Sequence, residues 1–104
     1  MGGEPLEAGP EGPMSLRWTR KARQDLERVY AFMEPVNPER ALVIVEVLVQ
    51  GAGRLSELPR LGERLRRYSR REVRRIFVGD YELRYELKAS DIIVLRLWHT
   101  REDR

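Results

Sequence analysis

The chain has 104 residues, of which 41% are hydrophobic and 36% charged, so it is large enough for one domain with a single modest core. It contains no cysteine and one histidine, which excludes disulfides, thiolate metal sites, cysteine nucleophiles and histidine-rich metal sites. No apolar run approaches the roughly 20 residues that span a bilayer. We therefore expect no membrane contact, no metal and no cofactor.

Residues 1–13, MGGEPLEAGPEGP, are acidic and interrupted by glycine and proline, unlike the basic start and apolar run of a signal peptide. They contain few large apolar side chains and are predicted to be a disordered extension. The folded domain is expected to span residues 14–104, because the apolar pattern begins at Met14. The protein is expected to stay in the cytoplasm.

Residues 16–18 are predicted to form a short strand, followed by two helices. Thr19 is a favourable N-cap for a helix that runs to about residue 34 and stops before Pro35. Asn37 and Pro38 suit the N-cap and first position of a second helix, which runs to about residue 55. Apolar stripes at helical spacing predict an antiparallel hairpin; the stripes are Ala22, Leu26, Val29, Tyr30 and Met33, and Ala41, Val45, Leu48, Ala52 and Leu55.

The second helix contains the run LVIVEVLV, whose β-branched residues would also suit a strand. We predict a helix because the cap, the length and the apolar stripe agree. Val43 and Val47 should project away from the core. They are either ordinary exposed valines or a docking ridge for a partner protein or a second copy of the chain.

Residues 71–103 are predicted to form three antiparallel strands, over residues 73–78, 81–88 and 92–98. Apolar and charged residues alternate strictly in the middle strand, which indicates one buried and one polar face. In the third strand, positions 93, 95 and 97 should continue the buried row, with Ile92 and Val94 on the opposite face beside Arg96 and Trp98. The predicted core joins Tyr81, Leu83, Tyr85, Leu87, Ile93, Leu95 and Leu97 to Ala22, Leu26, Val29, Val45 and Leu48.

These elements predict an α+β fold in which an N-terminal strand and a helical hairpin pack on a C-terminal antiparallel sheet of three to four strands. Charge is distributed unevenly: the net charge is +3, and residues 60–75 hold 8 arginines against 2 glutamates. Such a cluster favours a polyanion, either an acidic protein segment or a nucleic-acid backbone, unless it is simply a solvated face.

Two stretches resemble the toxins of the RelE/ParE superfamily, which belong to type II toxin–antitoxin modules and to plasmid stabilisation systems. They are REVRRIFVGDYELRYEL and the strand that ends in LRLWHTRED, and residues 58–62 resemble the short Pro/Gly loop that these toxins carry before the sheet. The ending with Trp98, His99, Arg101 and Asp103 is more similar to the ParE branch than to the RNA-cleaving branch. The resemblance implies a RelE/ParE-like toxin domain over residues 14–104.

Resemblance to the ParE branch implies a toxin that inhibits DNA gyrase without chemistry of its own and is neutralised by a cognate antitoxin. One alternative is a ribosome-dependent mRNA endonuclease of the RelE type. Another is a weakly toxic member that acts mainly in an autoregulatory complex with its antitoxin. A toxin dimer and a toxin–antitoxin hetero-oligomer are both compatible with this family.

An RNA-cleaving toxin must deprotonate a ribose 2′-hydroxyl, stabilise a pentacoordinate phosphate and protonate the leaving oxygen. Glu82 and Glu86 on the charged face of the middle strand would repel a phosphate backbone, so we favour gyrase inhibition. If the chain is a nuclease, the catalytic candidates are Arg74, Arg84, His99 and Arg101. The partner-binding candidates are Arg64, Arg67, Arg71, Arg74, Val43, Val47, Arg96, Trp98 and Arg101.

Overall fold

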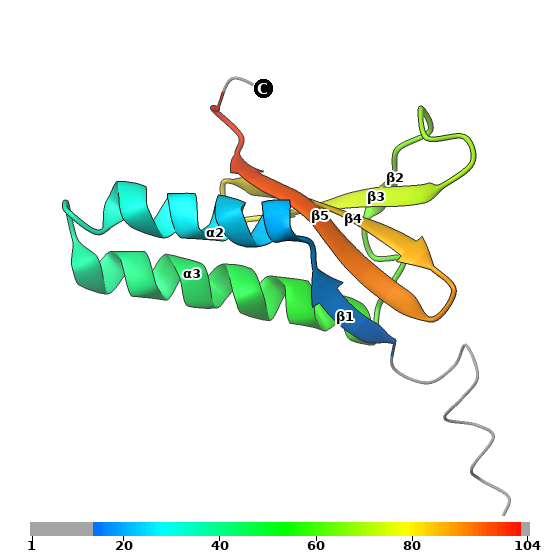
Figure 1. The fold of residues 1–104 in the computed structure, drawn as a ribbon, viewed down its shortest axis with the longest axis horizontal. Helices are drawn as coiled ribbons and strands as arrows, with labels where there is room; N and C mark the ends of the chain where they lie inside the picture. Colours follow the sequence, from blue (N-terminus) through cyan, green and yellow to red (C-terminus); the bar gives the residue numbers. More distant parts are fainter. Residues whose placement is uncertain (1–13, 103–104) are drawn as a thin grey trace, which may run out of the picture.

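The computed structural model describes residues 14–102, which form a strand, two helices, a short 3-10 helix and four further strands (Figure 1). The predicted extension, residues 1–13, and Asp103 of the C-terminal motif lie outside the described residues. Across residues 14–102, no helix is both long and apolar enough to span a bilayer. The elements are β1 Ser15–Trp18, α2 Arg20–Met33, α3 Pro38–Gly53, η1 Arg54–Ser56, β2 Glu63–Arg64, β3 Glu72–Val78, β4 Tyr81–Lys88 and β5 Asp91–His99.

Both predicted caps begin the helices of the hairpin. The Thr19 hydroxyl accepts a hydrogen bond from the Ala22 N–H at 3.0 Å, which satisfies one of the free donors of the first turn. The Asn37 side chain accepts the Arg40 N–H at 3.0 Å, and Pro38 occupies the first helical position. The prediction of a helix through the β-branched run of residues 42–49 is therefore confirmed.

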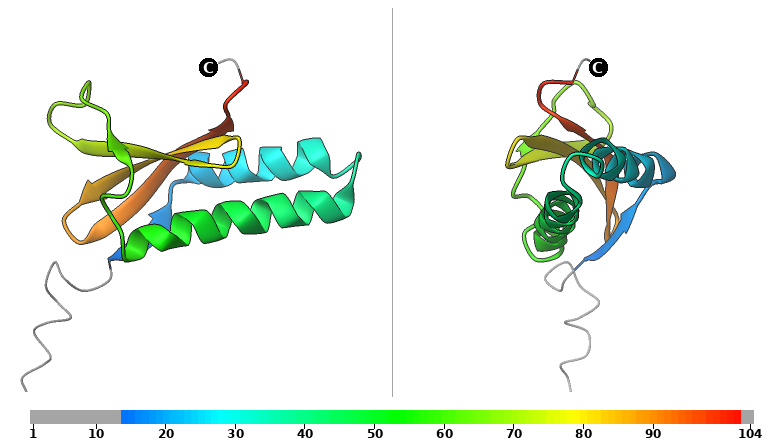
Figure 2. Two further views of the ribbon diagram at one scale, coloured as in Figure 1. Left: turned by 180° about the vertical axis from the view of Figure 1, so that it is seen from behind. Right: turned by 90° about the vertical axis from the view of Figure 1, so that its left-hand side faces the viewer.

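The sheet has five strands in the order β1-β5-β4-β3-β2. β1 runs parallel to β5, and the other neighbours are antiparallel. The two helices lie side by side, as Figure 2 shows, and contribute to the same core clusters as the sheet. The predicted α+β architecture is confirmed, and the C-terminal sheet has four antiparallel strands because the two-residue strand β2, which the sequence did not indicate, pairs with β3.

A β-bulge at Leu95 corrects the predicted faces of β5. Residues Arg84 and Tyr85 of β4 pair with Arg96 and Val94, so Leu95 has no partner across the ladder. The extra residue reverses the alternation of side chains. The prediction that positions 93 and 95 face the helices is therefore wrong; Ile92, Val94 and Leu97 pack in the core clusters with α2 and α3.

The core lies between the sheet and the helical hairpin in two clusters. One joins Ala22, Ala52 and Leu55 to Leu83, Tyr85, Ile92 and Val94, and the other joins Val29, Leu48 and Leu97. Of the predicted core residues, those buried between the sheet and the hairpin are Ala22, Val29, Leu48, Leu83, Tyr85 and Leu97, whereas Ile93 is buried on the opposite face of the sheet. The others are only partly buried: Leu26, Val45, Tyr81, Leu87 and Leu95.

Replacing Leu83 and Leu95 with alanine, one at a time, should distinguish a buried core position from a partly exposed position. Leu83 is fully buried, whereas Leu95 is partly exposed at the bulge. We expect Leu83→Ala to lower the free energy of unfolding by roughly 1–2 kcal/mol more than Leu95→Ala does, because it removes more buried contact and leaves a larger cavity. Urea denaturation of the two variants measures this difference, and equal losses would contradict the assigned faces.

Candidate functional site

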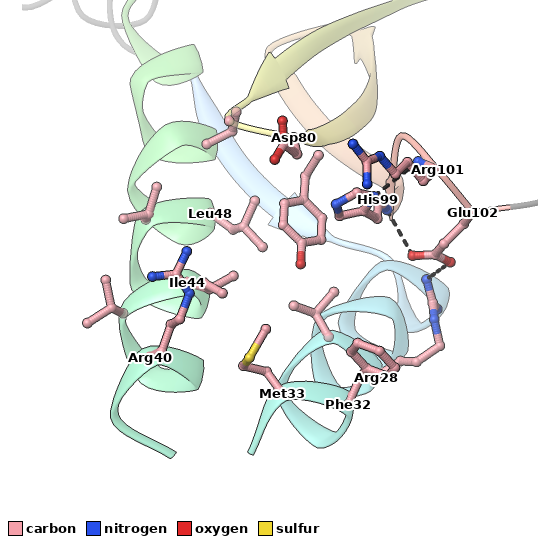
Figure 3. Close-up of a pocket in the computed structure, with 16 residues that line it drawn as sticks. Arg28, Phe32, Met33, Arg40, Ile44, Leu48, Asp80, His99, Arg101 and Glu102 are labelled. Atoms are coloured by element: carbon pink, nitrogen blue, oxygen red, sulfur yellow. Dashed lines mark hydrogen bonds and ion pairs between the residues drawn. The ribbon is translucent and has the colours of Figure 1, made fainter. Parts of the chain in front are cut away.

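An open groove of about 780 Å³ lies between α2, α3 and the β3–β4 turn (Figure 3). We call it the helix-end groove. Its apolar lining includes three side chains that remain well exposed: Phe32 at 79%, Val43 at 56% and Val47 at 48%. Arg40 and Arg101 contribute cationic groups to the same groove. Within residues 14–102, the groove therefore combines uncovered apolar surface with cationic groups, beside the carboxylates of Asp80 and Glu102.

The C-terminal segment forms one wall of the helix-end groove. Glu102 bonds the Arg28 guanidinium at 2.9 Å and accepts the His99 N–H at 2.8 Å, which ties the segment to α2 (Figure 3). The His99 ring meets Tyr81 edge to face, with centroids 5.0 Å apart. Its Nδ1 atom accepts the Arg101 N–H at 3.0 Å. The lone histidine is thus packed and hydrogen-bonded at the end of a strand.

Asp25 is a buried carboxylate that the sequence interpretation did not single out. Its oxygens accept hydrogen bonds from Arg96 at 2.7 and 3.1 Å, from Arg28 at 2.7 Å and from the Leu97 N–H at 2.9 Å. Burial acts to raise the pKa of Asp25, but the bonds from Arg96, Leu97 and Arg28 outweigh it and leave the pKa below its ordinary value of 3.8. Asp25 therefore anchors α2 to β5.

The sheet face that points away from the helices, which we call the open sheet face, carries alternating charges that neutralise one another, and its carboxylates Glu82 and Glu86 are buried beneath the arginines that bond them. Arg84 bonds Glu82 at 2.9 Å, and its guanidinium lies 4.9 Å from the centroid of the Trp98 ring. Arg71 bonds Glu86 through two contacts of 2.8 and 3.1 Å. These pairs reduce the net positive charge that this face can offer to a phosphate.

The arginines of residues 60–75 fall into two groups. Four hold carboxylates: Arg60 and Arg74 bond Glu72, Arg75 bonds Glu63, and Arg71 bonds Glu86. The others have no carboxylate partner within residues 14–102 and are exposed; they are Arg64, Arg66, Arg67 and Arg70.

Tyr68 is a second group that the sequence interpretation missed. Its hydroxyl oxygen accepts hydrogen bonds from Arg67 and Arg84, each at 3.4 Å. The Arg67 guanidinium beside it lowers the pKa of Tyr68, and Arg84 acts in the same direction. The ring lies under the guanidinium groups of Arg67 and Arg71, at 5.2 and 5.7 Å from the centroid. The feature of the sequence that could have identified Tyr68 is its position within a run of arginines.

Tyr85, by contrast, has a structural hydroxyl. It donates to the Pro59 carbonyl at 2.7 Å and accepts the Gly62 N–H at 2.9 Å, so it fixes the loop before β2. Burial raises the pKa of Tyr85. A Cβ atom at Gly62 would collide with the Arg75 carbonyl oxygen, which explains why the loop needs glycine there.

The catalytic candidates do not converge on one point. Arg84 lies on the open sheet face, whereas His99 lines the helix-end groove on the other side of the sheet. Arg74 shares the helix-facing side with Tyr85 and donates to the Gly62 carbonyl at 2.7 Å. Arg101, the fourth candidate, is an exposed lining residue of the groove.

The partner-binding candidates also divide between places. Val43, Val47 and Arg101 line the helix-end groove, and Arg64 and Arg67 are exposed near β2. Arg71 and Arg74 hold glutamates, and Arg96 holds Asp25. Trp98, the remaining candidate, is only 7% exposed, so little of its ring is available to a partner.

Sequence and structure comparisons agree on one group of proteins. The family described as the ParE toxin of the type II toxin–antitoxin system parDE matches residues 16–104. A solved chromosomal ParDE toxin–antitoxin system from P. aeruginosa is 28% identical, with a TM-score of 0.71, over 83% of this chain and 95% of that one. The RelBE2 toxin–antitoxin complex from Mycobacterium tuberculosis is 32% identical, with a TM-score of 0.60, over 84% and 98%. No curated protein sequence matches the chain significantly.

Proposed function

The chain belongs to the family of ParE toxins of type II toxin–antitoxin systems, and from this premise we propose that it inhibits DNA gyrase in the cytoplasm and is silenced by a cognate antitoxin. In this proposal the toxin acts by binding, without making or breaking bonds of its own. The observation that carries the proposal is the separation of the catalytic candidates on the two faces of the sheet.

General acid–base catalysis needs its groups within hydrogen-bond reach of the same reacting atoms. His99 and Arg84 cannot meet that requirement together, because the sheet lies between them. Arg74 uses its guanidinium to hold Glu72 and the Gly62 carbonyl. A surface that inhibits by binding has no such geometric requirement, so the arrangement supports gyrase inhibition over RNA cleavage.

We assign the antitoxin to the helix-end groove. Contiguous exposed apolar surface with a polar rim is typical of a protein-binding site. The occupant that fits is an antitoxin segment that places apolar side chains against Phe32, Val43 and Val47 and carboxylates near Arg40 and Arg101. Both solved relatives described above are toxin–antitoxin systems, which supports a protein partner of this kind.

One observation favours the alternative, an mRNA endonuclease that works on the ribosome. Tyr68 combines a lowered pKa with two arginine contacts beside the open sheet face. A phenol in such surroundings can exchange a proton while arginines stabilise a phosphate. This cluster would use Tyr68, Arg67 and Arg84 rather than His99.

Replacing His99 with glutamine and Tyr68 with phenylalanine should distinguish the two functions. We expect both variants to remain toxic, because neither a histidine proton nor a phenol proton takes part in gyrase inhibition. Induced cells should show stalled replication and DNA-damage signalling before translation slows. Purified gyrase supplied with the toxin should accumulate cleaved DNA.

Programmed ribosomes provide the opposing assay. Specific mRNA cleavage that disappears in Tyr68→Phe or His99→Gln, with gyrase unaffected, would overturn the gyrase proposal and establish the endonuclease. Circular dichroism of each variant serves as the control for folding, since the His99 ring packs on Tyr81.

A further inference from the structure

We propose that residues 64–71, which we call the arginine loop, bind the phosphate backbone of duplex DNA. The loop joins β2 to β3 and projects from the sheet at the end of the molecule opposite the α2–α3 turn (Figures 1 and 2). This activity goes beyond gyrase inhibition, because it requires neither gyrase nor antitoxin.

Charge is the first observation that supports a DNA contact. The sequence of the loop, RLRRYSRR, holds five arginines and no acidic residue. Arg71 is bound to Glu86, but the other four arginines of the loop have no carboxylate partner within residues 14–102. Neighbouring arginines outside the loop, at positions 60, 74 and 75, all hold glutamates. Positive charge is thus left unneutralised in one protruding segment.

The loop is held in a defined shape. Its ends are tied by the β2–β3 ladder and by a 2.8 Å bond from the Leu65 N–H to the Val73 carbonyl. Two successive turns follow, closed by bonds from Tyr68 to Leu65 and from Arg71 to Tyr68. The paired contacts between Arg71 and Glu86 fasten the far side. Because the loop is ordered in advance, binding loses less conformational entropy.

The aromatic rings near the loop argue for a duplex rather than a single strand. Proteins that hold single-stranded nucleic acid stack its bases on exposed aromatic faces. Within the loop, the Tyr68 ring is partly buried and lies under Arg67 and Arg71. Phe77 is 55% exposed, but it lies near the far end of β3, outside the loop. The loop contains no asparagine or glutamine for adenine edges, and its arginines, which can also bond guanine, lie on successive turns and not on a helix or β-ribbon that could enter the major groove. Contacts should therefore be made to phosphates and show little dependence on base sequence.

An acidic protein segment fits the loop less well. Protein interfaces obtain most of their affinity from buried apolar or aromatic anchors. None of the strongly exposed large hydrophobic residues lies within the loop, where Leu65 and Tyr68 are both partly buried. Duplex DNA needs no such anchor, because it presents about one negative charge per 1.7 Å of helix axis.

The arginine loop and the helix-end groove can be occupied together. They lie at opposite ends of β3, Glu72–Val78, because the loop precedes this strand and Val78 lines the groove. Seven residues of strand span about 23 Å at roughly 3.3 Å per residue. A toxin with its groove filled should therefore keep its contact with DNA.

Fluorescence anisotropy with the full chain and a labelled duplex of arbitrary sequence, about 20 base pairs long, tests the proposal. Replacing Arg66 and Arg70 with glutamine should reduce the slope of log K against log salt by about 2 and weaken binding roughly tenfold at low salt. The matched control is the double variant Arg20→Gln and Arg54→Gln, which removes the same charge from exposed positions on the helical part of the chain and should bind as the unmodified chain does.

Three results would overturn the proposal. The first is an unchanged salt slope in the loop variant. The second is a single-stranded RNA of equal length that binds as tightly as the duplex, which would indicate an RNA contact. The third is poly-glutamate that competes with the duplex at equal charge concentration, which would assign the loop to an acidic protein segment. None of these measurements involves gyrase, so they can fail while the proposed function stands.

Discussion

Introducing aspartate at both Val43 and Val47 should weaken antitoxin binding by at least about 100-fold. The two valines are well exposed within the helix-end groove, so an apolar antitoxin segment would bury them on binding. Each aspartate would then be desolvated among apolar side chains, and central apolar anchors alone are worth about 2 kcal/mol or more. Calorimetric titration of the toxin variant with the cognate antitoxin measures the change.

The same helix provides a matched control. Leu42 and Val49 are 60% and 43% exposed on α3 but do not line the helix-end groove. Aspartate at these two positions should change antitoxin affinity less than about threefold, because surface substitutions outside an interface cost little. Equal losses in both double variants would contradict the assignment. The assignment would also be contradicted if the toxin self-associates, if only the variant at Val43 and Val47 abolishes that self-association, and if its antitoxin affinity is unchanged.

Replacing Asp25 with alanine should lower the free energy of unfolding by about 3 kcal/mol, the lower end of the range for breaking a buried ion pair. The substitution leaves the buried Leu97 N–H without its acceptor and removes the partner of Arg28 and Arg96. The loss stays at the lower end because both arginine side chains are nearly half exposed and regain water. Urea denaturation at pH 7 measures it.

The pH dependence of stability tests whether the loss in Asp25→Ala comes from the missing carboxylate charge. Because the folded-state pKa of Asp25 lies below its ordinary value of 3.8, the carboxylate stabilises the fold above that value. The stabilisation is lost as pH falls through the folded-state pKa. The stability difference between the unmodified chain and Asp25→Ala should therefore narrow below about pH 4. A difference that stays constant from pH 7 to pH 3 would show that the loss comes from packing alone.

Local chemistry determined much of this fold before any tertiary contact was known. Thr19, Asn37 and Pro38 begin the helices because capping involves atoms only a few residues apart. The alternation in β4 indicated which residues face the helices, because side chains of a strand point to opposite faces in turn. It did not indicate burial, since Glu82 and Glu86 on the opposite face are buried as well. The stretches of residues 71–87 and 95–103 together indicated the toxin family, and the match to residues 16–104 agrees.

Only the tertiary structure decided which surfaces are available for binding. The bulge at Leu95 reverses the faces of β5, and no local pattern revealed it because a bulge depends on how two strands pair. In the sequence, Asp25 resembles any charged residue of a helix, and only the fold shows that Arg96, 71 residues away, bonds it. Residues 60–75 appear as one basic cluster in the sequence, yet the fold neutralises some arginines and leaves others exposed. The periodicity of a sequence indicates which face of its own helix or strand a residue lies on. Charge pairing depends instead on which residues of distant segments the fold places beside that residue.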